Sequence, residues 1–409
     1  MPVDGNISVL AMEFDDTTPI SVWESVSISD SFTDPIGQVD LQVRPTRADI
    51  SEYADKFKRG RQVTLKINRA PQGTYLIDTV MRTIDAGGVS YKLTLKSMLV
   101  TAYEGSVDPE ISKSFKSDTP VSQVVLEALD PYGFTQITVD TARDVGAISG
   151  KPIPGRKSSI TASALKIKDA QAQENETAYA FCQRMFNRLG VALRCDHTGE
   201  LLLSAPDYDQ EIIGQLIHEM VRARQGDRML DGIQITETNA GQFSEFCVRG
   251  KAPSSKKGQR RSGRPAARLG VASLAASRPS SAPFGSVPFV ALAESRAQYA
   301  SDAAPYKPKF ALDKFSRDVN RCQSVAKLVY GLKASKGFVV KCSVDGWVSG
   351  STGRVWAVDT MAHVVVEAVG LEEDMWISER VLTESDAGQL TTLTLIPKYS
   401  LLLGEIPKS

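Results

Sequence analysis

The stretch from Asn175 to Pro206 constrains the fold most, because the period of its apolar residues changes halfway along. The first half carries apolar residues at helical spacing, which predicts an amphipathic helix. Its apolar stripe consists of Ala178, Phe181, Cys182, Met185, Phe186 and Leu189. Asn175 or Thr177 can cap the start of this helix, and Gly190 can adopt the left-handed conformation that ends it.

The second half of the stretch alternates between apolar and polar or small residues, which predicts a β-hairpin over 191–204. Residues 196–199, Asp-His-Thr-Gly, supply its turn. Because the helix leads directly into the hairpin, we expect Phe181, Met185 and Leu189 to pack against its strands. Arg184 and Arg188 lie off the apolar stripe, and we expect their side chains to be exposed.

Length, charge and cysteine usage bound the class of protein. A chain of 409 residues suggests about three domains. Basic and acidic residues number 48 each, so no overall field recruits nucleic acid or a membrane surface. No apolar run approaches the ~20 residues that span a bilayer, and the N-terminus lacks the features of a signal peptide. The five widely spaced cysteines indicate buried free thiols in a reducing cytoplasm.

Residues 5–100 contain alternating runs separated by regular turns, which predicts consecutive strands. The runs are Ile7–Ala11, Ile20–Ile28, Val39–Val43, Val63–Ile67, Tyr75–Thr79 and Val89–Leu95. Pro71–Gly73 is expected to break the chain between two strands, Asp85–Gly88 to form a turn, and Asp49–Phe57 to form a short helix. This pattern favours a closed or nearly closed antiparallel barrel, with a sandwich as the alternative.

Helical spacing returns after Thr119-Pro120, where an apolar stripe over 121–129 predicts a helix that Asp130–Gly133 ends. A strand over 134–139 and a Gly/Pro/Ser/Lys-rich loop over 141–162 lead toward the central helix. A second β region begins near Met229. Its runs are Gly232–Thr238, Phe243–Arg249, Phe338–Val344, Arg354–Val358, Val364–Ala368, Met375–Val381 and Leu390–Ile396.

The second β region is interrupted in sequence. Residues 251–293 hold eight basic residues and no acidic one, among Ser, Pro, Ala and Gly, and a helix is expected around 316–334. We therefore expect an α+β fold, mostly β, in four parts. These are an N-terminal β-barrel (1–105), an α/β domain with the central helix and hairpin (106–205), a discontinuous second β-barrel (206–250 and 335–400), and an insertion with a basic Ser/Pro-rich loop and a helix (251–334).

No residue pattern carries recognisable chemistry, so we name no catalytic, cofactor-binding or metal residue and expect no enzyme. Residues 154–159 have the composition of a phosphate loop but lack its first glycine. His197, His218 and His363 have no partner at zinc-ligand spacing. The acidic run 372–374 precedes an apolar strand and is expected to be an exposed turn.

The basic stretch 251–278 admits three interpretations. It can be a solvated, disordered loop, since such a composition buries too little apolar surface to offset its ordering entropy. It can dock on an acidic protein partner and become ordered there. It can also contact phosphates, although no aromatic side chain is interleaved to stack on bases. A nucleic-acid partner is not expected.

Two parts of the chain together resemble a known family. The first is the helix, Leu-Gly-Val and hairpin at 175–206, and the second is the run from 344 to 393. That run reads Val-Asp-Gly-Trp (344–347), Gly-Arg-Val-Trp (353–356), a valine strand (364–366), Met-Trp-Ile (375–377) and a final strand from Gly388. In this order they resemble the baseplate hub proteins of contractile phage tails, the Mu-type tail protein family related to late control protein D. The insert around 251–310 has no counterpart in that resemblance.

The resemblance implies a scaffold in the baseplate of a contractile tail. It implies two tail-tube-like barrels in each chain and a homotrimer that joins a sixfold tail tube to a threefold central spike. The implied partners are further copies of the chain, the central spike, the tail tube or its initiator, the baseplate wedge proteins and the tape measure protein, with no membrane. The implied location is the virion tail baseplate, assembled in the host cytoplasm.

Two alternatives remain at this point. One is a spike module of the kind found at the N-terminus of type VI secretion spikes. The other is a cell-wall hydrolase associated with the tail tip, although no acid, base or nucleophile constellation supports it.

Overall fold

The computed structural model describes about three-fifths of the chain, and several expectations fall outside it. The loop at 141–162, the end of the central helix at Gly190 and the helix at 316–334 all lie outside the described residues. So does the basic stretch, apart from 271–272. The described residues are 8–14, 17–108, 121–139, 172, 175–186, 192–204, 206–219, 226–230, 232–238, 245–250, 271–272, 308–313, 336–398 and 400.

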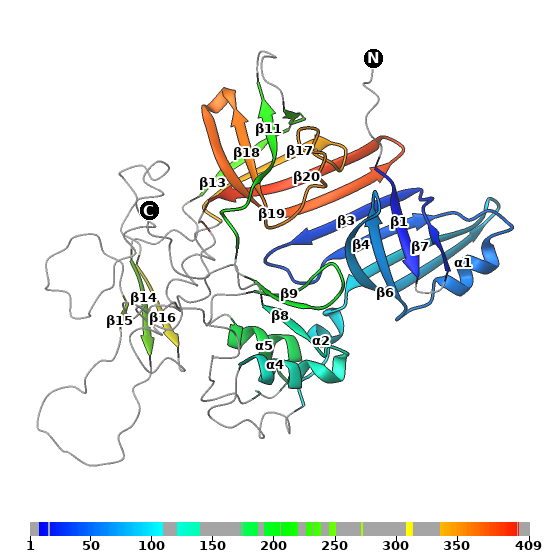
Figure 1. Ribbon diagram of the computed structural model, residues 1–409, viewed down its shortest axis with the longest axis horizontal. Helices are drawn as coiled ribbons and strands as arrows, with labels where there is room; N and C mark the ends of the chain where they lie inside the picture. The colour runs from blue at the N-terminus through cyan, green and yellow to red at the C-terminus, as the bar shows by residue number, and fades with distance from the viewer. Residues whose placement is uncertain are drawn as a thin grey trace, which may run out of the picture.

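The described chain is mostly β, which confirms the predicted fold class (Figure 1). One 14-stranded sheet holds most of the strands, and two three-stranded sheets hold the others. The helices are α1 (Ile50–Lys56), α2 (Val100–Glu104), α4 (Val121–Leu129) and α5 (Ala178–Phe186). Short 3₁₀ turns follow at Asp130–Tyr132 (η1) and Glu367–Val369 (η4).

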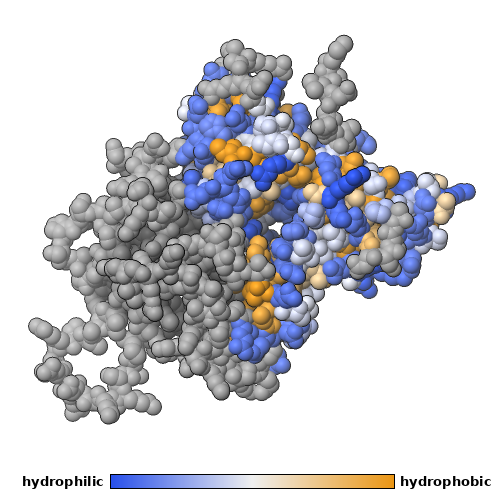
Figure 2. Space-filling model, viewed as in Figure 1, coloured by the Kyte–Doolittle hydropathy of each residue, from blue (hydrophilic) through white to orange (hydrophobic). Residues whose placement is uncertain are grey.

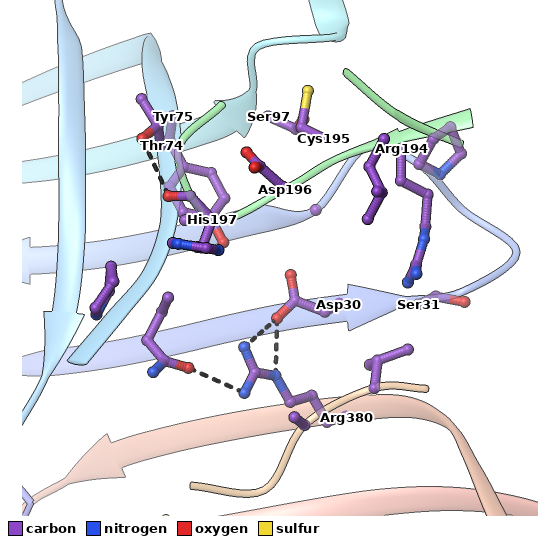
Figure 3. A pocket seen from close by; sticks show the side chains of 18 of the residues that line it. Asp30, Ser31, Thr74, Tyr75, Ser97, Arg194, Cys195, Asp196, His197 and Arg380 are labelled. Carbon is purple, nitrogen blue, oxygen red and sulfur yellow. Dashed lines mark hydrogen bonds and ion pairs between the residues drawn. The ribbon is translucent and has the colours of Figure 1, made fainter. Parts of the chain in front are cut away.

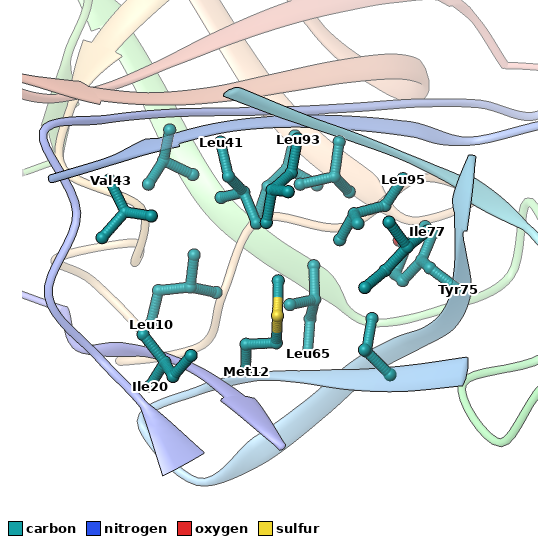
Figure 4. Close-up of a cluster of buried hydrophobic side chains, with 14 of the residues drawn as sticks. Leu10, Met12, Ile20, Leu41, Val43, Leu65, Tyr75, Ile77, Leu93 and Leu95 are labelled. Carbon is teal, nitrogen blue, oxygen red and sulfur yellow. The ribbon is translucent and has the colours of Figure 1, made fainter. Parts of the chain in front are cut away.

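The first strand unit consists of the seven N-terminal strands, in the order β3-β4-β7-β6-β5-β1-β2. They are β1 (Leu10–Phe14), β2 (Thr17–Ile20), β3 (Ser25–Ser31), β4 (Gln38–Val43), β5 (Gln62–Ile67), β6 (Ala70–Asp85) and β7 (Gly88–Ser97). Alternate residues point inward from strands that face each other. Figure 4 shows Leu10, Met12 and Leu65 opposite Leu41 and Leu93 in one apolar core. The predicted alternation is confirmed in the later runs, where Val39, Leu65 and Leu93 are buried. The first two runs were wrong: Val9 and Val22 are exposed, the buried residues of β1 are Leu10, Met12 and Phe14, and the chain between Ile20 and Ser25 is not a strand.

The second strand unit combines strands on both sides of the insert. They are β11 (Ile212–His218), β12 (Asp227–Arg228), β13 (Gln234–Glu237), β17 (Phe338–Asp345), β18 (Met361–Val366), β19 (Leu371–Ser385) and β20 (Gly388–Pro397). Pairing runs from β11 through β18, β19 and β20 to β17. Met229, directly after β12, bridges Val344 of β17, and β12 itself pairs with β11. The backbone hydrogen bonding therefore returns to its starting strand.

Strand β11 was not predicted from the sequence, because its residues do not alternate. It runs parallel to both β12 and β18, and Ile213, Leu216 and Ile217 are all buried. A parallel strand covered on both faces carries a nearly continuous apolar run. Strand β14 (Glu245–Gly250) pairs with β15 (Val271–Ala272) and β16 (Pro308–Asp313) in a separate sheet. The domain limits expected from the sequence remain proposals.

The α/β region confirms the predicted helix followed by a hairpin. Helix α5 and helix α4 cover a small sheet of β8 (Ile137–Val139), β10 (Leu201–Ser204) and β9 (Ala192–Cys195). Thr177 caps α5, since its Oγ1 accepts a hydrogen bond from the Ala180 N–H at 3.2 Å. Phe181 is fully buried. The side chains of Met185 and Leu189 lie outside the description.

Arg184 corrects an expectation. Its guanidinium contacts both carboxylate oxygens of Glu176, at 2.7 and 2.9 Å, and only 18% of its side chain is exposed. It also lies over the ring of Phe181, 5.4 Å from the centroid. The apolar stripe alone placed Arg184 at the surface, but Glu176 at the start of the helix draws it back over the core.

Two local expectations were wrong. Pro71 does not end a strand: it lies inside β6, opposite Lys66, and an irregular register between Leu65 and Lys66 accommodates it. The turn is instead formed by Asn68 and Arg69, which both have positive φ. Residues 354–358 form a connection with one isolated bridge, Val348 to Val355, and no strand.

The hairpins β6–β7 and β19–β20 are copies of one design. Each has one irregularity, between Ile77 and Thr79 in β6 and between Ile377 and Glu379 in β19. Each closes with a residue pair across the turn, Asp85–Gly88 and Ser385–Gly388. A residue of β6–β7 and the residue 300 positions later in β19–β20 therefore occupy equivalent positions, as Ile77 and Ile377 do.

The correspondence extends to the neighbouring strands. In the first unit the order is β3-β4-β7-β6-β5, and in the second it is β13-β17-β20-β19-β18, with antiparallel pairing throughout both. One chain thus carries the same five-strand pattern twice. The next strand differs, because β1 is antiparallel to β5 whereas β11 is parallel to β18.

The surface in Figure 2 is mostly hydrophilic, with apolar residues scattered over the strand units. The large apolar side chains that are most exposed include Val22, Met81, Ile84 and Val369. Among the described helices, none combines the length and the apolar character needed to cross a membrane.

We expect Phe181→Ala to lower the free energy of unfolding by about 3–5 kcal/mol, because it empties a fully buried aromatic site in the α/β core. Chemical denaturation measures this change. Gln123→Ala on the exposed face of α4 is the control, with a change within about 0.5 kcal/mol. Equal stability of the two variants would contradict the packing of α5 described above.

Candidate functional site

The two strand units join where β19 of the second pairs antiparallel with β3 of the first. Figure 1 shows β19 and β20 lying beside β3 in one continuous surface. The pairing extends from Glu379 opposite Ser31 to Glu384 opposite Val26, so residues some 350 positions apart become neighbours. We call this contact the junction. It determines how the two units are oriented, and it is the candidate functional site.

A buried ion pair lies within the junction. The Arg380 guanidinium donates to Asp30 Oδ2 from Nε at 2.8 Å and from Nη2 at 2.7 Å, and 6% of its side chain is exposed (Figure 3). Nη1 donates to Gln72 Oε1 at 3.2 Å and to the Trp356 carbonyl. A guanidinium that is this deeply buried is tolerated only when its charge is paired and its remaining N–H donors have hydrogen-bond acceptors. Arg380 meets both conditions with partners from both units.

Arg194 of β9 connects the α/β region to both strand units. Its Nη2 donates to Asp359 Oδ2 at 3.1 Å and to Ser204 Oγ at 2.8 Å. Its guanidinium carbon lies 4.3 Å from the centroid of the Phe32 ring, in cation–π geometry. Asp359 also accepts the Trp376 indole N–H at 3.1 Å. One cation therefore contacts groups from all three parts of the fold.

Apolar contacts complete the junction. Trp376 is fully buried and packs edge-on against Phe32 and Tyr208, with ring centroids 5.0 and 5.5 Å apart. Trp347, which follows β17 in the second unit, packs into the core of the first unit and donates its indole N–H to the Thr383 carbonyl at 3.0 Å. The first core is therefore incomplete without the second unit.

A cavity of about 450 Å³ opens between the three parts (Figure 3). Arg380 and Asp30 line one wall, Tyr75 another, and Arg194 and His197 a third. Burial raises the pKa of the Tyr75 hydroxyl, so the group stays neutral at physiological pH. His197 lies in the β9–β10 turn with an exposed side chain, as expected. Its carbonyl accepts a hydrogen bond from Thr74 Oγ1 at 3.4 Å.

The arrangement has the chemistry of a structural joint. Burial raises the pKa of the Cys195 thiol to about 11 and that of Cys342 to about 12, and it also raises the pKa of Cys182. Thiols with raised pKa values are poor nucleophiles. Among the described residues, no group of three or more His, Cys, Asp or Glu side chains could hold a metal ion.

Several residues singled out in the sequence are placed by the structure. His363 contacts Asp374 through Nδ1 at 2.7 Å on the surface of β18 and β19. The acidic run 372–374 is therefore part of strand β19, which corrects the expected turn. This part of β19 pairs antiparallel with β18. Residues 154–159 lie outside the described part of the chain.

The junction residues were not found from the sequence. Asp30, Arg194, Asp359 and Arg380 are charged residues in runs that otherwise look ordinary. One signal was present: Arg380 occupies an inward position of β19, two residues from the buried Leu382. A cation at an inward strand position requires a buried partner. Its partner could not be named, since it lies in a distant strand.

The comparisons with known proteins agree with this architecture. Residues 320–404 match the family model of the fourth domain of the Mu phage baseplate assembly protein GpP. This range includes Arg380 and strands β17 to β20. No curated protein is similar enough in sequence to count as a match.

Two solved structures share the fold over nearly the whole chain. The 43 kDa tail protein of prophage MuSo2 from Shewanella oneidensis is 15% identical, with a TM-score of 0.69, and the alignment covers 96% of this chain and 99% of that one. The tail protein from Neisseria meningitidis MC58 is 14% identical, with a TM-score of 0.68 and coverages of 96% and 98%. Both alignments thus extend over nearly the whole chain.

The domain match and the shared fold make this chain similar to the structural proteins of the phage tail baseplate. The predicted resemblance to baseplate hub proteins is confirmed by the match to the GpP domain at 320–404 and by the fold that the chain shares with the two tail proteins. A structural role in the baseplate is the role that this similarity supports.

We expect Arg380→Ala to lower the free energy of unfolding by about 3–5 kcal/mol, because it leaves Asp30 partly buried without its partner. Arg44→Ala is the matched control. Arg44 pairs with Glu24 and Asp85 at 40% side-chain exposure, and its loss should cost at most about 1 kcal/mol. Urea denaturation of both variants tests this; similar midpoints would show that the junction does not depend on the ion pair.

We also expect the buried thiols to resist alkylation. With a pKa of about 11, Cys195 in the folded protein should react with iodoacetamide at pH 8 on the order of a hundredfold more slowly than in denaturant, where an ordinary thiol pKa of about 8.5 applies. Cys182 and Cys342 should be protected as well. Peptide mass spectrometry after timed labelling gives the rate at each cysteine. Rapid labelling of Cys195 in the native protein would contradict this.

Proposed function

We propose that this protein is the structural hub of a contractile tail baseplate, where three copies join the sixfold tail tube to the threefold central spike. The supporting observation is the duplication of the five-strand pattern within one chain. Three chains carrying two similar units each present six similar units in a ring. Such a ring matches a sixfold partner on one side and a threefold partner on the other.

The junction supports this role physically. A hub transmits load between a tube and a spike, so its two units must keep one relative orientation. The β3–β19 pairing, the Arg380–Asp30 ion pair and the insertion of Trp347 into the first core join the units by backbone, charged and apolar contacts at once. Its partners in this proposal are the central spike, the tail tube or its initiator, the wedge proteins and the tape measure protein.

In this proposal the protein has no catalytic activity, and it resides in the virion baseplate after assembly in the host cytoplasm. The basic insert at 251–278 then serves as a docking segment for an acidic surface of a baseplate neighbour. That assignment rests on its composition, since the stretch lies largely outside the described residues.

Sedimentation velocity tests the oligomeric state. We expect the purified chain alone to sediment with three times the monomer mass of 44.4 kDa, or to form a complex with three copies of the chain when it is mixed with its spike protein. A monomer under both conditions would overturn the trimer.

Electron microscopy of particles carrying a tag on the chain tests its location. Label at the centre of the baseplate is expected for the hub. Label absent from tail particles, but present on a secretion apparatus, would favour the type VI spike module instead.

A further inference from the structure

The duplicated hairpins differ in one respect. Among the described strands, the outer edge of β19 in the second hairpin pairs with another strand, and the equivalent edge of β6 in the first hairpin does not. Beyond its irregularity, β19 pairs with β20 on one side and with β3 on the other. The equivalent part of β6, residues 79–85, pairs with β7 alone among the described strands, because β5 reaches only to Leu76. Leu382 is fully buried, whereas the equivalent Arg82 is exposed.

Exposed apolar side chains mark this unpaired edge. Met81 is 58% exposed and Ile84 is 80% exposed. Long strand edges that combine unpaired backbone groups with apolar side chains attract another strand unless they are blocked by charge, proline or a bulge. Residues 79–84, Thr-Val-Met-Arg-Thr-Ile, contain one charge and no proline. We call this segment the β6 edge.

Among the described strands, the counterpart of β3 also has a neighbour on one side only. In the duplicated pattern β13 is equivalent to β3, since each pairs antiparallel with the corresponding next strand, β17 or β4. Among the described residues β13 pairs with β17 alone. Ile235 is half-buried, whereas the equivalent Ile28 is fully buried. We call residues 233–237 the β13 edge.

The two edges lie on opposite sides of the molecule (Figure 1). The β6–β7 hairpin projects to one side, next to α1, and β13 lies at the other side of the second strand unit. One copy therefore cannot join its own two edges. A contact between them is necessarily head-to-tail between copies, and head-to-tail contacts form a closed ring when the rotation between neighbours closes.

We infer that the β6 edge of one copy pairs antiparallel with the β13 edge of the next, in the register that β19 and β3 use within the chain. The number of copies in the ring rests on the proposed function; the pairing itself rests on the duplication. Transfer of the β19–β3 register places Val80 opposite Glu237, Met81 opposite Thr236, Arg82 opposite Ile235, Thr83 opposite Gln234 and Ile84 opposite Ile233.

The side chains that meet in this register are compatible. Ile84 faces Ile233, so the most exposed apolar residue of the β6 edge gains an apolar partner. Arg82 and Glu237 become diagonal neighbours on the same face, within reach of long side chains of opposite charge. No like charges lie opposite each other. A shift by one residue would move every inward side chain to the other face, so this register is strongly favoured.

Disulfide trapping tests the pairing in the full-length protein. Met81 and Thr236 lie opposite each other and are both exposed in the single chain. The equivalent pair, Val381 and Ser29, is of the narrow, non-hydrogen-bonded kind. The Phe32 N–H donates to the Ser378 carbonyl three residue pairs away, and hydrogen-bonded and non-hydrogen-bonded pairs alternate along an antiparallel ladder. A Met81→Cys/Thr236→Cys variant should form reducible dimers and a closed covalent ring on mild oxidation.

The controls fix the register. Met81→Cys combined with Gln234→Cys places the two thiols diagonally, and it should cross-link at least about tenfold more slowly, since disulfides require Cβ atoms about 4 Å apart. The single variants report any bridge to native cysteines. Faster trapping of the diagonal pair, or no trapping of Met81→Cys/Thr236→Cys, would overturn the inferred pairing.

A charged residue at the edge provides a second measurement. Ile84→Lys should raise the dissociation constant of self-association by about tenfold or more, because it removes a buried apolar contact. Val369→Lys is the matched control: Val369 is 63% exposed and lies in η4, away from both edges, so its substitution should leave self-association unchanged. Equal effects of the two substitutions would contradict the inference.

The outcomes separate this inference from the proposed function. A trimer that sediments normally but shows neither trapping nor sensitivity to Ile84→Lys would leave the hub proposal standing and overturn the edge pairing. A monomer with no trapping would overturn both. A trapped closed ring of three chains supports both.

Discussion

The Arg380–Asp30 ion pair is the interaction on which the arrangement of the chain depends. A guanidinium with 6% side-chain exposure is tolerated only beside a carboxylate that satisfies it, and here that carboxylate belongs to the other strand unit. The backbone pairing of β3 with β19 brings the two groups together, and the ion pair in turn opposes any slip in that pairing. Trp347 and Arg194 add an apolar and a cation–π contact that bind the same parts.

Duplication explains why the chain needs such a junction. Two copies of one five-strand pattern could be joined in many orientations, but a ring assembly needs one. Within the chain, β19 of one copy of the pattern pairs antiparallel with β3 of the other. In the inferred assembly, the equivalent β6 and β13 edges extend the same geometry to a neighbouring chain. The internal contact would then be the template for the contact between chains, and its rigidity would determine whether the proposed ring closes.

Short-range features of the fold were predictable where one physical cause dominated. Alternation placed most strands, and Gly133 and Gly199 ended a helix and closed a hairpin with positive φ. The described residues of the α5 stripe, Ala178, Phe181 and Cys182, are buried as expected. The errors arose where tertiary pairing outweighed a local rule. Pro71 remained in a strand because an irregular register accommodates it, and β11 was missed because a parallel strand covered on both faces need not alternate.

The sequence by itself determined the mostly β class, the helix–hairpin at its centre, the absence of a recognisable catalytic pattern and the resemblance to baseplate hub proteins. These follow from the spacing of apolar residues and the order of motifs, which are local properties. Only the tertiary structure decided that the C-terminal strand β19 lies against β3 and that Arg380 pairs with Asp30. It also decided that, among the described strands, the end of β6 lacks the partner that the equivalent part of β19 has. Contacts between residues hundreds of positions apart depend on how two complete units dock. Periodicity along one strand carries no information about which distant strand it will meet.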